Sequence, residues 1–353
     1  MILFSPGPSN ISERVRHALL HPDIGHREPE FGVLLDQVRA GIRSVCAVPA
    51  THEIVLLGGA GSVGIESVVA AAAPNGPLLV IANGPYGERA AAMARHHGTT
   101  TDEWRLPWGA DIPRNVLAAR LRETRPASVY VVHHETATGR LNPLRDIAAI
   151  THEHGARILA DTISSIGGEL LDIGAWGLDA VIGSANKCLR GVPGAAFVIA
   201  SPRFATAARA QRAPHYSNYA LHAESQQRGE FPFTPPLHAL FALREALGET
   251  RDEGPGRRIA HYAALMAQLR DGLERLALPP LIAAEHGGHT IAAMPLPVSW
   301  SYARLHEALK ADGLVIYAAQ GPLAATHFRV GLIGHYGTDA VARLLSAMRR
   351  LLT

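Results

Sequence analysis

Short apolar runs alternate with helical patterns between about residue 50 and about residue 200, and this alternation restricts the fold more than any other feature. Six runs rich in valine, isoleucine and leucine are bounded by turn residues: EIVLLGG (53–59), PLLVIAN (77–83), SVYVVHHE (128–135), RILADT (157–162), AVIGSA (180–185) and AAFVIAS (195–201). Such runs predict buried strands. Helical stretches such as YGERAAAMARHHG (86–98) separate several of them, so we expect an α/β fold whose largely parallel sheet has helices on both faces.

The last two predicted strands are joined by one short loop. The loop SANKCLRGVPG covers residues 184–194, and a parallel crossover needs a dozen or more residues, so these strands are expected to be antiparallel. From about residue 240 the pattern changes to amphipathic helices alternating with strand-like segments. We therefore predict a large domain over residues 1–240, which includes an N-terminal arm, and a small α+β domain over residues 241–353.

The composition argues against several classes of protein. The 33 basic and 31 acidic residues nearly cancel and form no basic block, so no nucleic-acid or membrane partner is expected. Cys46 and Cys188 lack metal-site spacing, and no apolar run reaches membrane length. His133 and His134, interpreted as sheet-edge residues, and HEHG (152–155) lack H-E-x-x-H spacing, so no metal is predicted. The start of the chain does not resemble a signal peptide, which makes the cytoplasm the expected location.

The segment LLGGAGSVGIES (56–67) has the pattern of a strand end, a glycine-rich turn and a helix start. Backbone N–H groups at a helix N-terminus bind phosphate through their unpaired donors and the helix dipole. Ala60, Gly61 and Ser62 are small enough to permit that approach. A tight strand–helix turn without a ligand explains the segment about as often, and the Lys-Ser/Thr pair of a P-loop is missing.

An acid ends one of the predicted strands, and a lysine follows another. Asp161 lies at a strand end, where ligands bind in open α/β sheets, although a lone aspartate there is as often a helix N-cap. Lys187 stands among small residues, and removal from water lowers the pKa of an amine and makes it nucleophilic. A solvated loop lysine is the common alternative. With the phosphate-binding turn, these residues match pyridoxal phosphate, which needs an amine for its aldehyde and an acid for its pyridine nitrogen.

Eight motifs in order along nearly the whole chain resemble the class V aminotransferases, a family of fold-type I pyridoxal-phosphate enzymes. They are SPGPSN (5–10), GAGS (59–62), NGPYGERA (83–90), HHETATGRLNPL (133–144), DTISSIGG (161–168), SANKCLRGVPG (184–194), FTPPLH (233–238) and FRVGLIG (328–334). Within this family the chain is most similar to transaminases that use 2-aminoethylphosphonate as amino donor and pyruvate as acceptor. The resemblance implies a seven-stranded, mostly parallel sheet in the large domain, the cofactor pyridoxal 5'-phosphate and a homodimer with its active site at the subunit interface.

The resemblance also implies a role for each matching residue. Lys187 would bond to the cofactor and move the substrate proton, Asp161 would keep the pyridine nitrogen protonated, and Arg329 would bind the carboxylate of the 2-oxo acid. The remaining cofactor contacts would be Ala60, Gly61 and Ser62 at the phosphate, Tyr86 and Ile163 on the two ring faces, Thr136 at the phenolic oxygen, and Thr234 at the phosphate of the neighbouring subunit. Taken singly, Tyr86, the two threonines and Arg329 could be ordinary turn, cap and ion-pair residues. The motifs that contain them follow the same order along the chain as in the family, which favours the family roles.

Three features leave the amino donor open. Val63 stands where phosphonate transaminases carry an aromatic residue, GHREPEF (25–31) resembles the alanine–glyoxylate and serine–glyoxylate branch, and Arg190 replaces an uncharged residue. A phosphonate dianion needs cationic partners, for which Arg27 and Arg190 are candidates beside Arg329, although Arg190 has an equal alternative as a cap of its own loop. The expected reaction gives phosphonoacetaldehyde and L-alanine. The alternatives are a glyoxylate-type class V transaminase with alanine or serine as donor, and a transaminase or lyase acting on a related amino-phosphonate.

Overall fold

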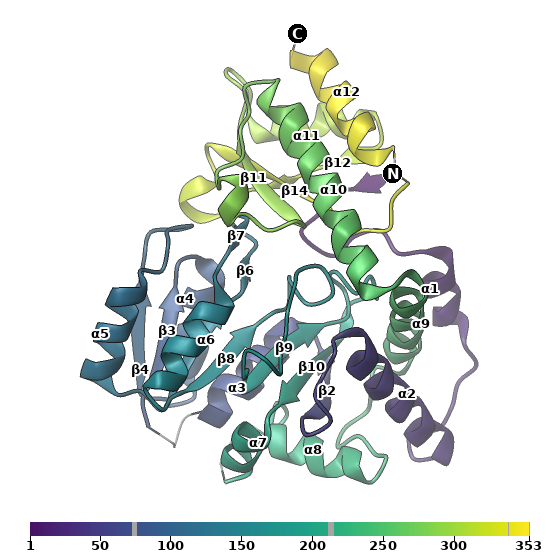
Figure 1. Cartoon of the computed structure of the whole chain (residues 1–353). Helices are drawn as coiled ribbons and strands as arrows, with labels where there is room; N and C mark the ends of the chain where they lie inside the picture. Colours follow the sequence, from purple (N-terminus) through teal and green to yellow (C-terminus); the bar gives the residue numbers. More distant parts are fainter. Residues whose placement is uncertain (73–75, 211–214, 338, 353) are drawn as a thin grey trace.

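The computed structural model describes residues 1–72, 76–210, 215–337 and 339–352. A seven-stranded sheet forms the lower part of the molecule in Figure 1, and a smaller α+β part lies above it. The strand order in the sheet is β2-β10-β9-β8-β5-β3-β4. The strands are β2 (Glu53–Gly59), β3 (Leu78–Ala82), β4 (Thr101–Arg105), β5 (Ser128–Val132), β8 (Arg157–Asp161), β9 (Ala180–Ser184) and β10 (Gly194–Ala200).

The six predicted strands are all present, and the sheet is mostly parallel as expected. Strands β3, β4, β5, β8 and β9 pair in parallel, whereas β10 is antiparallel to both β9 and β2, which confirms the prediction from the short loop. The sequence did not predict β4. Because β4 is an edge strand in which only Trp104 is buried, its sequence TDEWR lacks the apolar run of a central strand.

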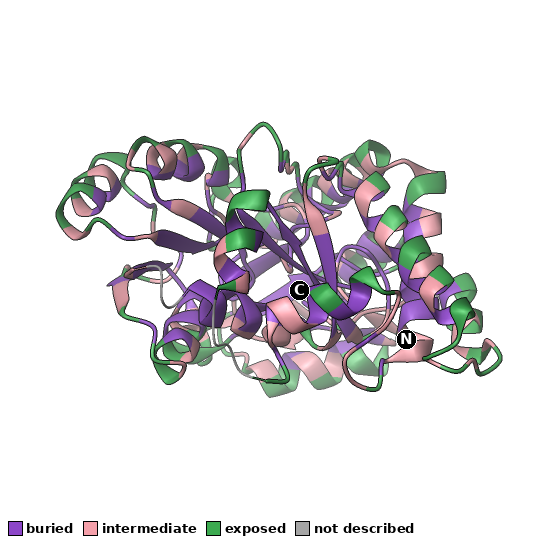
Figure 2. Ribbon diagram, turned by 90° about the horizontal axis from the view of Figure 1, so that it is seen from below, coloured by how far each residue is buried: buried purple, intermediate pink, exposed green. Residues whose placement is uncertain are grey.

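Two helical layers cover the sheet, because successive strand residues point to opposite faces. Leu79 and Ile81 pack with one layer, and Leu78 and Val80 pack with the other. The first layer contains α2 (Pro29–Val45), α5 (Arg114–Thr124), α6 (Leu144–Glu153) and α9 (Leu237–Glu253), and the second contains α3 (Gly61–Ala72), α4 (Pro85–His96), α7 (Pro202–Arg209) and α8 (Tyr219–Gln227). Figure 2 shows the buried strands in purple and the exposed outer faces of the helices in green.

The smaller part has its own core of C-terminal elements. Its antiparallel sheet contains β11 (Ile291–Pro295), β14 (His327–Gly331) and β13 (Tyr317–Ala318), and its helices are α10 (Pro255–Glu274), α11 (Tyr302–Ala311) and α12 (Ala340–Leu352). The N-terminal strand β1 (Ile2–Leu3) pairs in parallel with β12 (Leu314–Val315), and Phe4 is buried in the same core. The chain therefore starts beside its own C-terminal helix (Figure 1). The domain division at residue 240 stays a prediction.

The shorter elements include α1 (Glu13–His17) before α2, and the hairpin of β6 (His134–Glu135) and β7 (Arg140–Leu141) after β5. Within the described residues, no helix is long and apolar enough to cross a membrane. The same residues contain no group of three or more histidine, cysteine, aspartate or glutamate side chains placed to hold a metal ion.

Candidate active site

The carboxyl ends of β2, β8 and β9 meet at one edge of the large sheet, where α/β folds bind their ligands. A cavity of about 200 Å³ lies at this edge. It is lined by Ala60, Gly61, Ser62, Ile65, Tyr86, Arg89, Val132, His134, Thr136, Asp161, Ile163, Ser164, Ser184, Asn186 and Lys187. The structure thus brings together eight of the twelve residues that the sequence predicted for the site.

Lys187 lies in the loop between β9 and β10 and is half-buried. Its Nζ donates a hydrogen bond to the carbonyl oxygen of Pro6 at 2.6 Å. Gly7 has a φ of +124°, and a Cβ at that position would lie 2.5 Å from the same Nζ, so glycine is required for this close approach. Removal from water lowers the pKa of Lys187 to about 8; the charge of Arg329 acts in the same direction and that of Asp161 opposes it. Much of the amine is therefore neutral, and hence nucleophilic, near pH 8.

Asp161 ends β8 and is buried in the cavity wall. Its Oδ1 accepts a hydrogen bond from the backbone N–H of Ile163, and its Oδ2 accepts one from the hydroxyl of Tyr130, both at 3.0 Å. Burial raises the pKa of Asp161 to about 6, although both hydrogen bonds and the charge of Lys187 oppose the shift. The carboxylate is therefore ionised at neutral pH and rigidly held, as a partner for a protonated ring nitrogen must be.

A turn of small residues connects β2 to α3, which begins at Gly61. A Cβ on Gly61 would lie 2.6 Å from the side chain of Ile163, so glycine lets the helix approach the loop that follows β8. The first N–H groups of a helix have no partner within the helix and bind phosphate oxygens well. This turn, the desolvated amine of Lys187 and the buried carboxylate of Asp161 fit pyridoxal phosphate, the cofactor that the sequence resemblance implies.

Tyr86 lies in the first turn of α4 and is held from three directions. The Arg89 guanidinium lies 4.9 Å from the centre of its ring, and the Arg329 side chain is hydrogen-bonded to its hydroxyl. Its backbone N–H donates to the Glu135 carboxyl at 3.3 Å. The ring is therefore fixed beside Thr136, which lines the same cavity, as a residue that stacks on a planar ligand must be.

Arg329 belongs to β14 of the smaller part and reaches across to the cavity. Its Nε donates to the carbonyl of Ala318 at 2.9 Å, and its Nη1 donates to the carbonyl of Thr136 at 3.3 Å. Burial lowers the pKa of Arg329, while Tyr86 and Glu135 raise it. Since a guanidinium stays charged in proteins, Arg329 places a buried cation directly beside the cavity.

Three of the predicted residues lie away from the cavity. Thr234 and Arg27 are exposed on this chain, and their roles stay predictions because Thr234 was expected to act on a neighbouring subunit. Arg190 is buried, but its Nε donates to the Tyr262 hydroxyl at 2.9 Å and its Nη1 lies 3.7 Å from the Glu253 carboxylate. The structure therefore gives Arg190 partners within the chain instead of a place at the substrate cavity.

Several residues of the cavity were not predicted. Arg89 stands three positions after Tyr86. Because residues three apart lie on the same face of a helix, the sequence could have predicted that Arg89 lies beside Tyr86. His134 was interpreted as a sheet-edge residue, but it is buried and lines the cavity, with Nδ1 3.2 Å from Oγ1 of Thr290. The Ser184 hydroxyl donates to Oδ1 of Asn186 at 2.6 Å in the segment that leads to Lys187. No pattern in that segment marks these two residues as cavity-lining.

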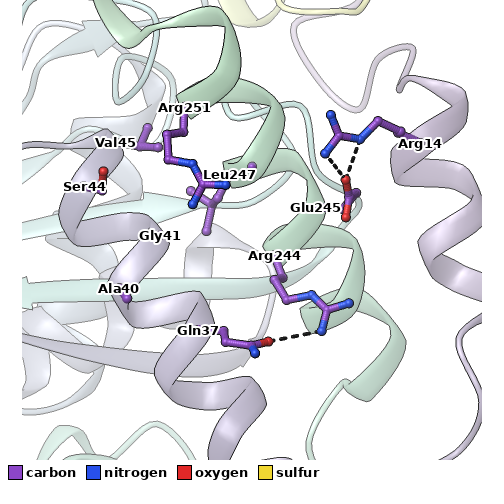
Figure 3. A pocket seen from close by; sticks show the side chains of 11 residues that line it. Arg14, Gln37, Ala40, Gly41, Ser44, Val45, Arg244, Glu245, Leu247 and Arg251 are labelled. Atoms are coloured by element: carbon purple, nitrogen blue, oxygen red, sulfur yellow. Dashed lines mark hydrogen bonds and ion pairs between the residues drawn. The ribbon is translucent and has the colours of Figure 1, made fainter.

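A second hollow, of about 690 Å³, lies between α1, α2 and α9 (Figure 3). The Arg14 side chain forms an ion pair with Glu245, and the Arg244 side chain donates to Gln37 at 3.1 Å. Because these polar side chains pair with one another, we assign no function to this hollow.

Glu135 is fully buried beside the cavity. A Cβ on Gly84 would lie 2.3 Å from its carboxyl carbon, and its oxygens accept hydrogen bonds from the backbone N–H groups of Tyr86 and Ala137, both at 3.3 Å. Burial raises the pKa of Glu135 to about 8 despite these two hydrogen bonds. The carboxyl therefore carries a proton at neutral pH in the cofactor-free protein.

Replacing Glu135 with glutamine should stabilise the cofactor-free protein at alkaline pH. The folded carboxyl keeps its proton up to about pH 8, whereas the unfolded one releases it near the usual value of 4.5. The folded state binds more protons between these values, so wild-type stability falls as the pH rises through this window. Thermal unfolding midpoints of the two proteins should agree at about pH 4 and separate increasingly as the pH rises from about 4.5 to about 8, with the variant higher. Equal midpoints throughout would show that Glu135 is ionised in the folded protein.

The fold and the lysine–aspartate site together define a fold-type I transferase. The family model described as Aminotransferase class-V matches residues 5–322. Two relatives named 2-aminoethylphosphonate–pyruvate transaminase, from Burkholderia thailandensis and Aeromonas hydrophila, are 35% and 36% identical; the matches cover 99% and 98% of this chain and 97% and 94% of theirs. An alanine–glyoxylate aminotransferase from Nostoc sp. has a TM-score of 0.93 and 27% identity, covering 100% of this chain and 95% of its own.

The chain therefore belongs to the class V aminotransferase family, and it is a transaminase. Membership of this family implies the use of pyridoxal phosphate, which the residues of the cavity fit.

Proposed function

We propose that the protein transfers the amino group of 2-aminoethylphosphonate to pyruvate, forming phosphonoacetaldehyde and L-alanine. The observation that carries the proposal is the 35% identity, over 99% of the chain, to a transaminase named for these two substrates. The cavity supports it, because Lys187 and Asp161 line the cavity and Arg329 lies beside it.

Pyridoxal phosphate would be held by residues from five segments of this chain. The turn of Ala60, Gly61 and Ser62 would bind the phosphate, Asp161 the pyridine nitrogen, Tyr86 and Ile163 the ring faces, and Thr136 the phenolic oxygen. When bound, the cofactor supplies an electron sink for the carbon that carries the amino group. Lys187 would anchor the cofactor between turnovers, and its free amine would move the proton between that carbon and the cofactor.

Both proposed substrates are anions, so their binding requires buried cations. The planar guanidinium of Arg329 matches the geometry of a carboxylate. The same guanidinium would bind the phosphonate group when the amino donor occupies the site. Arg89 lines the cavity, with its guanidinium 4.9 Å from the centre of the Tyr86 ring, and is available for the second charge of a phosphonate dianion. Arg190 has no part in this proposal, because its guanidinium is bound to Tyr262.

A glyoxylate-type transaminase is the second candidate. The TM-score of 0.93 with an alanine–glyoxylate aminotransferase and the segment GHREPEF at residues 25–31 both favour it. Identity to that structure is only 27%, lower than the 35% to the phosphonate transaminase, which is why we place it second.

We further propose a cytoplasmic homodimer. Thr234 is exposed, and the neighbouring Phe233 stacks on Tyr216, itself 54% exposed, with 5.0 Å between ring centres. Exposed aromatic side chains of this kind are typical of interfaces. Both cysteines are buried and free, in keeping with a reducing compartment. Light scattering would test the dimer, and a monomeric mass at working concentrations would contradict it.

A donor and acceptor screen tests the proposed function. Purified protein with pyridoxal phosphate should transfer the amino group of 2-aminoethylphosphonate to pyruvate faster than it transfers that of alanine to glyoxylate, or that of serine or the 1-hydroxy phosphonate to either acceptor. Turnover only with glyoxylate would support the second candidate, and release of ammonia without alanine would indicate a lyase.

Replacing Arg329 with glutamine should raise the KM for pyruvate roughly 10- to 100-fold, the factor expected when a charged hydrogen-bond partner is lost. Glutamine keeps a donor but loses the fork and the charge. The matched control is Arg304→Gln: Arg304 is an exposed arginine of α11 that lies over Trp300 and should leave KM unchanged. A KM for pyruvate that stays at the wild-type value in Arg329→Gln would exclude Arg329 as the carboxylate ligand.

A further inference from the structure

The loop that carries Lys187 is closed by an unusual turn. The backbone N–H of Arg190 donates to the carbonyl of Lys187 at 2.8 Å, and Arg190 has a φ of 60°. Residues other than glycine rarely adopt this left-handed conformation, and they keep it only where surrounding contacts hold it. The side chain of Arg190 leaves the loop in the direction of α10, away from the residues that line the cavity.

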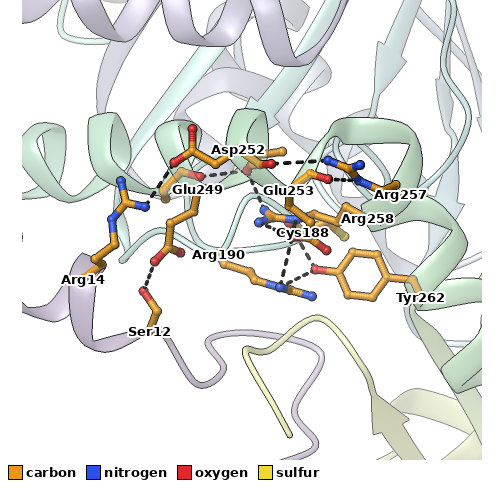
Figure 4. Close-up of polar contacts among 12 residues, drawn as sticks. Ser12, Arg14, Cys188, Arg190, Glu249, Asp252, Glu253, Arg257, Arg258 and Tyr262 are labelled. Atoms are coloured by element: carbon orange, nitrogen blue, oxygen red, sulfur yellow. Dashed lines mark hydrogen bonds and ion pairs between the residues drawn. The ribbon is translucent and has the colours of Figure 1, made fainter. Parts of the chain in front are cut away.

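One buried hydroxyl receives that side chain. Tyr262 on α10 is fully buried, and its hydroxyl accepts a hydrogen bond from Nε of Arg190 at 2.9 Å, with the guanidinium 4.9 Å from the ring centre. The same hydroxyl faces two carbonyl oxygens as a donor, that of Cys188 at 3.2 Å and that of Ile333 at 3.3 Å. Figure 4 shows Tyr262 pointing toward Arg190 and Cys188.

A second set of contacts fixes the corner where α9 ends and α10 begins. Glu253, the last residue of α9, lies 3.7 Å from Arg190 and accepts a hydrogen bond from Nε of Arg258 at 2.7 Å (Figure 4). Arg258 is 1% exposed and also donates to the Thr250 hydroxyl at 2.5 Å. Because this corner is held by hydrogen bonds from the buried Arg258 guanidinium, it provides a rigid support for Arg190 and Tyr262.

The two carbonyls at Tyr262 belong to the segments that carry the principal site residues. Cys188 directly follows Lys187, and Ile333 stands four positions after Arg329 on the segment that leaves β14. A single hydroxyl therefore connects the backbone beside the reactive amine with the backbone that continues from the substrate-binding guanidinium. Displacement of a reacting group by about 1 Å is enough to lower a rate 100-fold, so a connection of this kind bears directly on turnover.

We propose that Tyr262 and Arg190 are positioning residues, which hold Lys187 in the cavity at a fixed spacing from Arg329. The proposal rests on the proposed function insofar as Lys187 and Arg329 act on the substrates. It assigns Arg190 a role in the turnover step and none in donor binding.

The test removes the hydroxyl and keeps the ring, in the variant Tyr262→Phe. The chain has only two lysines, Lys187 and the exposed Lys310, so brief acetylation of cofactor-free protein followed by peptide mass spectrometry reports on Lys187 with an internal reference. In the wild type the labelling of Lys187 should reach half its maximum near pH 8. In the variant, water should reach the loosened amine and move this midpoint upward by about half a pH unit or more.

Turnover provides the second readout. We expect kcat of Tyr262→Phe to fall about 10-fold while the KM values for donor and acceptor stay within about 2-fold, since positioning affects the reacting state more than binding. The matched control is Tyr219→Phe, which removes another buried tyrosine hydroxyl. Tyr219 lies on α8, and its hydroxyl donates to Glu53 of β2 instead of to the loop that carries Lys187. The control should keep the wild-type labelling midpoint and kcat.

The possible outcomes distinguish failure of the positioning role from failure of the proposed function. A folded Tyr262→Phe with wild-type midpoint and kcat, or with only its KM values raised, overturns the positioning role. Should that variant not fold, Arg190→Asn decides, because asparagine tolerates the left-handed turn but is too short to reach Tyr262; it should show the same two changes. If wild-type protein does not turn over the phosphonate donor, the proposed function fails, while the labelling midpoints still test the position of Lys187.

Discussion

Replacing Lys187 with alanine should lower turnover by about 1000-fold or more while leaving the protein folded, since a positioned proton-transfer group alone contributes 100- to 10,000-fold. The alanine variant loses both the covalent anchor of the cofactor and the base that moves the substrate proton. It leaves only the carbonyl of Pro6 without its amine partner, and the strands on either side of the loop, which do not depend on Lys187, are buried except at Gly194. We therefore expect an inactive protein with a nearly unchanged unfolding midpoint.

The other lysine of the chain supplies the control. Lys310 is exposed on α11, and Lys310→Ala should retain wild-type turnover and the visible absorption band of the bound cofactor. The band should be displaced in Lys187→Ala, because the cofactor aldehyde has no amine to bond with. A small primary amine such as methylamine should restore part of the turnover by entering the space that the side chain leaves. More than a tenth of wild-type turnover in Lys187→Ala without added amine would rule out its proposed role.

The sequence predicted the sheet well because central strands of a parallel sheet are buried on both faces and therefore consist of continuous apolar runs. The edge strand β4 lacks that property, and its sequence gave no signal. The site residues that follow strand ends were predicted for a related reason. Asp161 lies at the end of a predicted strand, the turn at residues 60–62 follows a second and Lys187 follows a third within two residues; parallel strands bring their carboxyl ends to one edge.

Contacts between distant segments gave no local signal. The carbonyl that holds Lys187 belongs to Pro6, 181 positions earlier in the chain. Arg190 is close to Lys187 in sequence, and proximity suggested a substrate ligand, but the left-handed turn at Arg190 directs its side chain to Tyr262, 72 positions later. The backbone conformation of one residue thus separates two neighbours into different sites, and no pattern of residue types along the loop reports it.

Replacing Asp161 with asparagine should lower kcat roughly 100- to 1000-fold, the usual effect of removing one preorganised electrostatic partner from an active site. Asparagine has nearly the same shape and still accepts the hydrogen bond that Ile163 donates at 3.0 Å, so the fold should be kept. It carries no charge and cannot keep a ring nitrogen protonated. Because a buried carboxylate that resists ionisation is exchanged for a neutral amide, the unfolding midpoint should stay equal or rise.

The variant Tyr130→Phe tests the role of the Asp161 carboxylate with a smaller change. The Tyr130 hydroxyl donates to Asp161 at 3.0 Å and lowers the pKa of that carboxyl, so its removal should raise the pKa further above the ordinary value. The ionised carboxylate is the active form, and the acid limb of the kcat profile should therefore move to higher pH, with a smaller loss at alkaline pH than in Asp161→Asn. A fall in kcat of less than about fivefold in Asp161→Asn would be smaller than the loss of an electrostatic partner produces. Asp161 would then be a structural residue at a strand end. In that case Tyr130→Phe should leave the pH profile where it is, so the two variants together distinguish a carboxylate that acts on the cofactor from one that only orders its own loop.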